Sequence, residues 1–179
     1  MSQTTPFSLD TPPSNSLRGR ITTSSGDTFW QDRSATQSSK LTITPLVLQG
    51  DEFWTKENGF LTITFPNTIT LSMSKNTHIS FVQTLPTNFV IQQGSGAVEY
   101  QKKSETPVAI RALNLLVQQK EGTCAVTIGE SGRIEITVKK GLITTAFNDT
   151  ENISTVEETY EGNTFIYNDD TRTSRSTTL

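Results

Sequence analysis

The sequence predicts an all-β protein, arranged as a sandwich, barrel or solenoid of short strands. Apolar side chains alternate with polar ones along most of the chain, as in "FLTITF", where Leu61, Ile63 and Phe65 share one side. Clusters of turn-forming residues separate these runs at intervals of about 8 to 12 residues. Threonine, which is β-branched and favoured in strands, is abundant, although only 32% of the residues are hydrophobic.

The elements expected in the body follow from these runs. The expected strands are, in order, 60–65, 69–73, 78–82, 89–91, 108–110, 115–117, 125–128, 134–138 and 165–167. The expected turns are ENG, FPN, SKN, LPTN, GSG, KSE, KEG, ESG, KKG, NDTEN and EGN. Residues 109–120 offer a helical alternative, but they lack an N-cap and lie between turns that suit strands, so strand is favoured. Residues 121–147 read as three strands separated by two glycine-containing turns, the second at Gly141.

Length and charge limit the classes of protein to which the chain can belong. The 179 residues suit one domain with a buried core. With 15 basic and 18 acidic residues the formal charge is −3, which argues against nucleic acid binding and gives no polybasic segment for anionic lipid. A single cysteine excludes an internal disulfide. No apolar run approaches a membrane span, and no leader pattern is visible.

The two ends differ from the body in composition. Residues 1–16 are rich in Ser, Thr and Pro without periodicity, and residues 169–179 have the same character. Such composition is typical of linkers and disordered arms. We therefore expect a disordered arm at 1–16, a single folded β domain at 17–168 and a disordered tail at 169–179.

Few side chains could carry covalent or metal chemistry. His78 is the only histidine, which excludes a multi-histidine metal site, and alternation places it opposite Ile79, toward solvent. Cys124 shares a side with Val126 and Ile128, so we expect a buried core thiol that is unreactive.

Acidic residues gather at three places, and a glycosidase would need two of their carboxylates across a cleft. Solvated loop residues are the favoured interpretation, and a calcium site near Asp149 or Asp169 has no supporting spacing. The acidic groups are Asp51 and Glu52, then Glu157, Glu158 and Glu161, then Asp169 and Asp170.

Glycines and aromatic residues also have two interpretations. Gly94 and Gly96 lack the Lys-Ser/Thr of a phosphate loop, so a hairpin turn or a bulge that needs positive φ is favoured. Aromatic residues could form a sugar-binding platform, although plugging the ends of the β core is favoured. These residues are Phe29, Trp30, Phe53, Trp54 and Tyr160. Sequons at Asn148 and Asn152 are expected by chance in a chain so rich in Ser and Thr.

No residue in this inventory is assigned a catalytic, cofactor-binding or metal-binding role. The sequence thus predicts a protein that is not an enzyme and uses no cofactor.

The order of several short motifs resembles the FecR-like domain, the extracytoplasmic β domain of bacterial regulators. These motifs are Gly50-Asp51, Asn67 with Ile69 and Leu71, then 96–100, 122–126 and 138–143. The resemblance covers roughly residues 17–168. It implies a twisted β-sandwich with solenoid-like stacking of short antiparallel strands, and a signalling or interaction role without catalysis.

The best-known members of that family have three further parts. A cytoplasmic anti-sigma segment and a transmembrane helix precede the domain, and a small C-terminal domain that contacts an outer-membrane TonB-dependent transducer follows it. None of these parts is expected within this sequence, so the resemblance leaves open whether siderophore signalling is involved.

The resulting hypothesis is an extracytoplasmic protein-interaction and signalling module, periplasmic or extracellular and tethered to the membrane by a segment outside this chain. Its partner would be a protein, such as a cell-envelope component, bound through exposed strand edges or loops and not a nucleic acid. Two alternatives stay open. Trp30, Trp54 and the acidic loops suit a carbohydrate-binding module, and the Thr/Ser richness suits a structural cell-surface module.

Overall fold

The computed structural model of the chain describes residues 12–178, and within them it contains 15 strands and no helix. The strands are β1 (Gly19–Ser25), β2 (Thr28–Gln31), β3 (Ser39–Lys40), β4 (Leu46–Val47), β5 (Glu52–Thr55), β6 (Phe60–Phe65), β7 (Ile69–Met73), β8 (His78–Leu85), β9 (Asn88–Lys102), β10 (Val108–Ala112), β11 (Leu115–Ile128), β12 (Arg133–Asn148), β13 (Ser154–Tyr160), β14 (Asn163–Asn168) and β15 (Thr173–Thr178). The all-β prediction is confirmed, and the segment 109–120 is strand. Nothing in residues 12–178 forms a helix that could cross a membrane.

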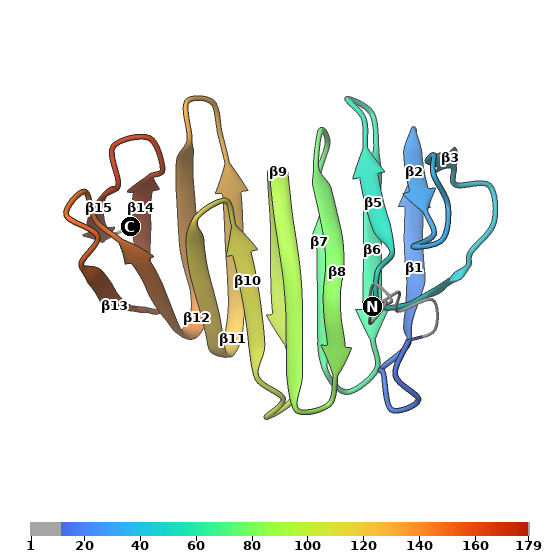
Figure 1. The fold of residues 1–179 in the computed structure, drawn as a ribbon, viewed down its shortest axis with the longest axis horizontal. Coiled ribbons are helices and arrows are strands. Elements are labelled where there is room, and N and C mark those ends of the chain that lie inside the picture. Colours follow the sequence, from blue (N-terminus) through green and yellow to red (C-terminus); the bar gives the residue numbers. More distant parts are fainter. Residues whose placement is uncertain (1–11, 179) are drawn as a thin grey trace, which may run out of the picture.

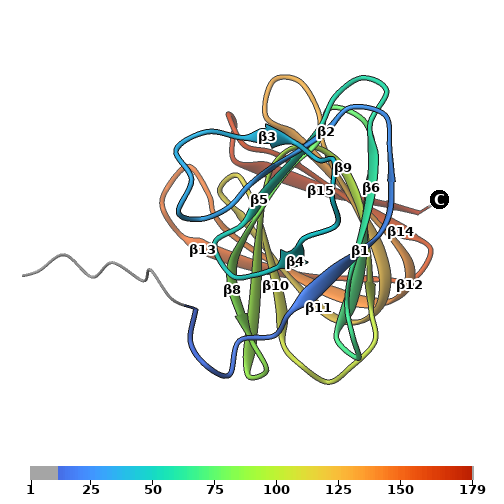
Figure 2. The same cartoon turned by 90° about the vertical axis from the view of Figure 1, so that its right-hand side faces the viewer.

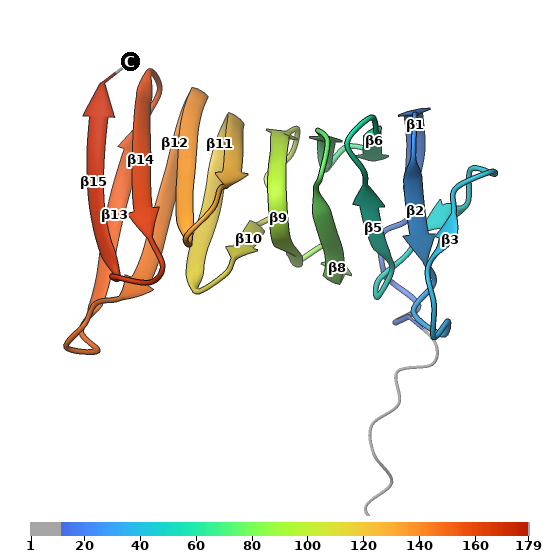
Figure 3. The same cartoon turned by 90° about the horizontal axis from the view of Figure 1, so that it is seen from above.

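The strands belong to one hydrogen-bonded sheet that folds into two layers around a common core (Figure 1, Figure 2). Layer A contains β3, β2, β5, β8, β10 and β13, with the first halves of β9 and β11 and the second half of β12. Layer B contains β4, β1, β6, β7, β14 and β15, with the remaining halves of β9, β11 and β12. Figure 3 shows the strands following one another along the long axis. The predicted twisted sandwich with solenoid-like stacking is therefore confirmed; β9 and β10 form a parallel pair within it.

Three long strands pass from one layer to the other at glycines. β9, β11 and β12 have 15, 14 and 16 residues, and they bend where φ is +76° at Gly96, +79° at Gly122 and +85° at Gly141. Gly122 and Gly141 are cross-strand partners. A Cβ on Gly122 would lie 2.1 Å from the carbonyl oxygen of Lys140, so no side chain fits there. The bend therefore requires glycine on both strands.

These bends correct part of the turn prediction. Turns were expected at GSG, KEG and KKG, but the chain continues as strand through all three. A glycine with positive φ can end a strand or redirect it, and composition does not distinguish the two outcomes. The register with β8 slips between His78 and Ile79, whose partners are Ser95 and Gln93, so a bulge lies at Gly94, whereas the positive φ lies at Gly96. No hairpin turn forms there.

Two of the bends are each supported by a buried glutamine. Gln93 donates from Nε2 to the carbonyl oxygens of Gly96, at 2.9 Å, and Val126, at 3.1 Å. Gln119 repeats this arrangement three residues before Gly122, with bonds of 2.8 Å to Gly122 and 3.1 Å to Tyr100. A bent ladder leaves carbonyl groups that need donors, and burial makes that need costly. The repeated pattern Gln-x-x-Gly is therefore a corner motif of this fold.

The core lies between the layers, and the alternation of the sequence identifies its members. Leu61, Ile63 and Phe65 are fully buried, as are the inward residues of β7 and β8. One aromatic group, toward the β1 end, brings together Phe53, Phe65, Phe81 and Phe89. A second group toward the β15 end contains Phe147, Phe165 and Tyr167. A single continuous core results.

Both ends of the chain depart from the predicted domain limits. Residues 173–178 form β15, which pairs with β14 along its whole length, so the expected disordered tail from residue 169 is not what the structure contains. Its hydroxyl side chains do not weaken the ladder, because that ladder uses the backbone. Within the predicted arm, the backbone N–H of Ser16 donates to the carbonyl of Pro13. At the start of the body, the N–H of Leu17 donates to the carbonyl of Thr84. Residues 1–11 lie outside the described residues.

Candidate interaction surfaces

Asp51 and Glu52, predicted together as an acidic group, point to opposite sides of layer A. Asp51 is 1% exposed, whereas Glu52 is half-buried on the outer face. Asp51 Oδ2 accepts the N–H of Leu48 at 2.9 Å, and Oδ1 is buried inside the body. Burial raises the pKa of this carboxyl to about 6; the Leu48 N–H opposes the shift and the Asp32 carboxylate adds to it. An enclosed carboxyl of this kind is inaccessible to a polysaccharide.

His78 belongs to a small polar and aromatic cluster on the outer face of layer A. Its ring stacks on Trp54, with 4.7 Å between centroids and 2° between planes, and its Nε2 lies 2.9 Å from Glu52 Oε2. The outward position was predicted, but the ring is half-buried by these two contacts. Gly94 makes room for it, since a Cβ there would lie 2.8 Å from His78 Nδ1. One face of Trp54 is thereby covered.

The five aromatic residues considered for a sugar platform do not lie together. Phe29 pairs with Trp54 in the ladder, and both are half-buried on the outer face of layer A. Phe53 is fully buried, and Trp30 packs against the core from the inner side. Tyr160 is on β13, at the opposite end of the stack. The sequence could not separate inward from outward residues here, because adjacent aromatics occupy both sides of a strand.

Cys124 is fully buried among the apolar residues of layer B, as predicted. Burial raises the pKa of its thiol to about 12. A thiol in this state has almost no thiolate at neutral pH, so the structure gives it a packing role.

The glutamates of β13 differ in direction. Glu157 points toward β15, where its carboxylate accepts a hydrogen bond from the Ser174 hydroxyl. Glu158 lies on the outer face and accepts one from the Tyr160 hydroxyl at 2.9 Å. Glu161 reaches Gly141 at 3.2 Å. These carboxylates are therefore spread over the inner side, the outer face and the bend.

The remaining acidic residues close turns. Asp149 Oδ1 accepts the N–H groups of Glu151 and Ile153, both at 2.9 Å. Asp169 accepts from Asn114, at 3.0 Å from the side-chain amide. Across residues 12–178, no group of three His, Cys, Asp or Glu side chains is placed to hold a metal ion.

The two sequons fall in the same turn region. Asn148 Oδ1 accepts a bond from the Ser154 hydroxyl at 2.9 Å, and Asn152 Oδ1 accepts one from Arg172 at 3.1 Å. Both side chains thus take part in the turn that joins β12 to β13.

The sheet is open, and β13 and β15 end the two layers on the same side of the stack. Neither edge has a further strand beside it within the described residues. The inward positions of these strands are polar: Thr155, Glu157 and Thr159 on β13, and Ser174 and Ser176 on β15. Stacked folds end their hydrophobic core with a polar last coil. An inward charge on an edge strand also discourages accidental pairing with a strand of another chain.

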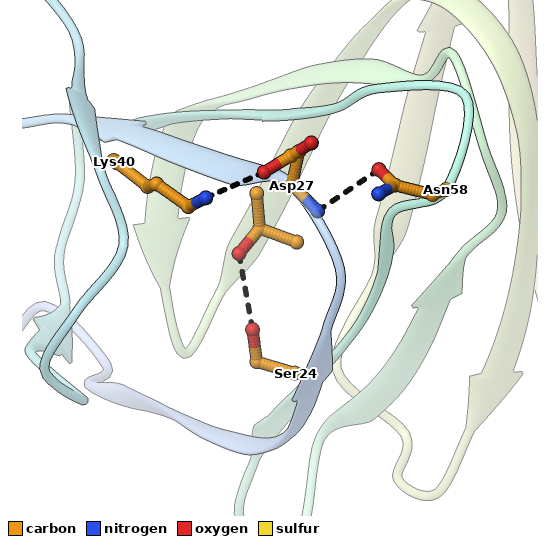
Figure 4. A network of polar contacts seen from close by, with 5 residues as sticks. Ser24, Asp27, Lys40 and Asn58 are labelled. Carbon is orange, nitrogen blue, oxygen red and sulfur yellow. Dashed lines mark hydrogen bonds and ion pairs between the residues drawn. The ribbon is translucent and has the colours of Figure 1, made fainter.

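The opposite end of the stack is held by a polar network at the β1–β2 turn (Figure 4). Lys40 Nζ lies 2.6 Å from Asp27 Oδ1, and the Asp27 N–H donates to Asn58 Oδ1 at 3.1 Å. Ser24 and Thr28 share a hydroxyl contact of 3.0 Å. The Lys40 and Asn58 contacts lower the pKa of the Asp27 carboxyl. This network fixes the short strand β3 against the body.

Apolar side chains emerge on the outer face of layer A near the β13 end. Leu116 is 41% exposed and Val156 is 65% exposed, and they lie in one cross-strand row with Ala146 between them. The sequence predicted a strand at 115–117 but did not single out Leu116 as its exposed residue. The row depends on the register of three strands, which no local pattern reveals.

Leu113 is exposed beside this row in an unfavourable backbone conformation. Its φ is +53°, in the two-residue turn between β10 and β11. Glycine and asparagine are the usual residues there, and another residue costs about 1 kcal/mol. Leu113 is 42% exposed, so burial within the described chain offsets this cost only in part.

Five lysines gather at the lower corner where β9, β11 and β12 meet: Lys102, Lys103, Lys120, Lys139 and Lys140. A hollow of about 440 Å³ lies against the first three of them. Glu105 and Glu121 line the same hollow, and Lys139 pairs with Glu99. The sequence indicated no polybasic segment, and the structure brings the lysines together only with acidic residues between them.

No protein-family model and no curated protein sequence matches the chain. Two crystal structures share the fold, both of a protein from Parabacteroides distasonis ATCC 8503 described as a "putative anti-sigma factor". The TM-score is 0.61 for the 1.65 Å structure and 0.59 for the 2.50 Å structure, each at 12% sequence identity. The match covers 71% of this chain and 59% of the other chain. At this identity the similarity concerns the fold alone.

Proposed function

We propose that this chain is a non-catalytic, extracytoplasmic protein-interaction and signalling module of the FecR-like type. The protein that carries it is bacterial and is anchored in a membrane by a segment outside the folded body. The module needs no cofactor or metal, and it binds a protein of the cell envelope through strand edges or loops.

The observation that carries this proposal is the stack of strands joined by glycine bends. Gly96, Gly122 and Gly141 belong to the motifs of the FecR-like resemblance, and each has positive φ at a bend. Gly50, from the first motif, has φ of +92°, and a Cβ there would lie 2.7 Å from Arg33 Cβ. The glycines of the resemblance are therefore those that this fold needs. The best-known FecR-like proteins carry an anti-sigma segment, which agrees with the similarity to an anti-sigma factor structure.

The open edge of β15 supports binding by strand addition. An edge strand offers unpaired backbone groups to an extended peptide, whatever the side chains. β15 carries one charge, Arg175, which points away from the core, whereas β13 has the inward Glu157. Because an inward charge opposes pairing, β15 is the more accessible of the two edges.

Fractionation of cells that make the native protein tests the location. An antibody against the folded body should detect a band heavier than 19.7 kDa, the mass of this chain, in the membrane fraction. A soluble cytoplasmic band at the mass of the chain would overturn the extracytoplasmic part of the proposal.

Photo-crosslinking in the same cells tests the partner. A photoreactive residue in place of Thr177 on the β15 edge, whose side chain points away from the core, should give a discrete adduct with an envelope protein. The same residue in place of Thr62, on the outer face of layer B, is the control and should give none. Equal labelling from both positions would argue against edge recognition.

The stacked pair of Trp54 and His78 favours one alternative, a carbohydrate-binding module. Glu52 beside it can accept hydrogen bonds from hydroxyl groups. Titration with a panel of glycans, followed by tryptophan fluorescence in the native chain and in Trp54→Phe, separates the two functions. A signal that Trp54→Phe abolishes would replace the interaction proposal, and silence across the panel would remove the alternative.

A further inference from the structure

The apolar row on layer A has a charge at each side. Arg111, Leu116, Ala146 and Val156 lie side by side on four adjacent strands, because each is the cross-strand partner of the next. Glu158 follows Val156 by two residues on β13, so it points to the same outer face. The row therefore starts at a cation, has an apolar middle and ends beside an anion.

We propose that this row is the interface of a homodimer, in which a second copy of the chain packs face to face on layer A. The two-fold axis runs parallel to the strands, between β11 and β12. It places β11 of one copy over β12 of the other, and β10 over β13. Two-fold interfaces are self-complementary in this way, and packed sheets align their strands within about 30°.

The chemistry of the row fits this axis. Leu116 of one copy lies over Ala146 of the other, so a large side chain faces a small one. Arg111 lies over Val156 of the second copy, and Glu158 of that copy is about 7 Å further along the strand, within reach of a guanidinium. Both contacts form twice. The exposed apolar side chains are thereby covered and the charges are paired.

The two turns next to the row, at the ends of its four strands, obey the same symmetry. Leu113 is at the β10–β11 turn and Ile153 at the β12–β13 turn, and both are exposed. The two-fold axis exchanges the β10–β11 pair with the β12–β13 pair. Leu113 of one copy therefore lies near Ile153 of the other. The dimer therefore gives the strained, exposed leucine an apolar partner.

The charge pattern favours a second copy in this orientation. With the axis perpendicular to the strands, each strand would lie over its own equivalent, and the two Arg111 side chains would face each other. The parallel axis instead opposes each cation to an anion. This inference does not rest on the proposed function, because it concerns the outer face of layer A and not the β15 edge.

Sedimentation equilibrium over a range of concentrations tests the apolar contacts of the proposed dimer. The wild-type chain should form dimers in a concentration-dependent way. Val156→Ser should weaken the dimer roughly tenfold, because two exposed apolar contacts are lost. Ile43→Ser is the matched control: Ile43 is 67% exposed, outside the row, and the change should have no effect. A wild-type chain that stays monomeric at every concentration would overturn the proposal.

A charge exchange tests the orientation. Arg111→Glu and Glu158→Arg should each weaken the dimer roughly tenfold or more, since each places two like charges together. The double variant should regain most of the wild-type affinity. Arg20→Glu, on the outer face of layer B, should leave the dimer unchanged. A double variant no better than the single ones would refute this arrangement even if the chain associates.

Discussion

The outer faces of the two layers have the same backbone pattern but different chemistry. On layer B, hydroxyl groups meet across the strands: Thr62 with Ser72 at 3.3 Å, Thr64 with Thr70 at 3.1 Å, and Thr137 with Thr164 at 3.2 Å. On layer A, the comparable outward positions near β13 carry exposed apolar side chains. A face whose polar groups pair with one another is complete in water, whereas an exposed apolar row is typical of a surface that contacts another molecule.

The largest expected effect comes from the bend that joins the two faces. Gly122→Ala should lower the free energy of unfolding by about 4 kcal/mol, because the new Cβ meets the Lys140 carbonyl and φ is positive. Chemical denaturation measures this loss. Gly162→Ala has the same φ of +79° with nothing within 4 Å, and should lose only about 1 kcal/mol. Similar losses in both would mean that the contact with Lys140 has no energetic role.

The inner sides of the layers also differ, because layer A covers a buried carboxyl. The folded-state pKa of Asp51 is raised to about 6 from 3.8, so its stabilising contribution is complete below pH 4 and is lost as the pH rises through 6. Asp51→Asn should therefore be more stable than wild type at pH 7 by up to about 3 kcal/mol, and no more stable at pH 4. Thermal unfolding across this pH range measures the difference.

Asp27→Asn provides the contrast for that experiment. Lys40 and Asn58 lower the pKa of Asp27, so its contribution is present above pH 4 and is lost as the pH falls through the lowered value. The variant should be slightly less stable than wild type at pH 7. An Asp51→Asn profile parallel to wild type at every pH would show that this carboxyl is not the source of the slope.

A corner glutamine should have an intermediate effect. Gln119→Leu removes the donor for the carbonyl groups of Tyr100 and Gly122 and should cost about 2 kcal/mol in stability. Gln118→Leu, the exposed neighbour on the same strand, should change stability by less than about 0.5 kcal/mol. If the two variants unfold alike, the amide bonds do not support the bend.

The smallest expected effects come from two substitutions that exchange the chemistry of the two outer faces. Thr137→Val removes the hydroxyl contact with Thr164 and should cost about 0.5 kcal/mol. Val156→Thr should leave stability nearly unchanged and raise the solubility of the chain. Denaturation at concentrations where the chain is monomeric measures stability, and precipitation assays measure solubility. A large stability loss in monomeric Val156→Thr would mean that this side chain packs within its own chain.

Local alternation identified the core strands because one buried face imposes a period of two, as in Leu61, Ile63 and Phe65. Cys124 was predicted for the same reason. The bends at Gly122 and Gly141 could not be distinguished from turns, since positive φ serves both. The row from Arg111 to Val156 was not predictable either, because it joins four strands whose register follows from those bends.

The three bent strands also determine how the body responds to mechanical force. The two ends of the described chain lie at opposite ends of the stack (Figure 1), so a pull between them acts across the strands. Such a load separates backbone bonds one strand at a time, starting at β15 or β1. β9, β11 and β12 each belong to both layers, so removing any one of them opens both layers at once. The stack thus combines outer strands that yield under low tension with a middle that resists it.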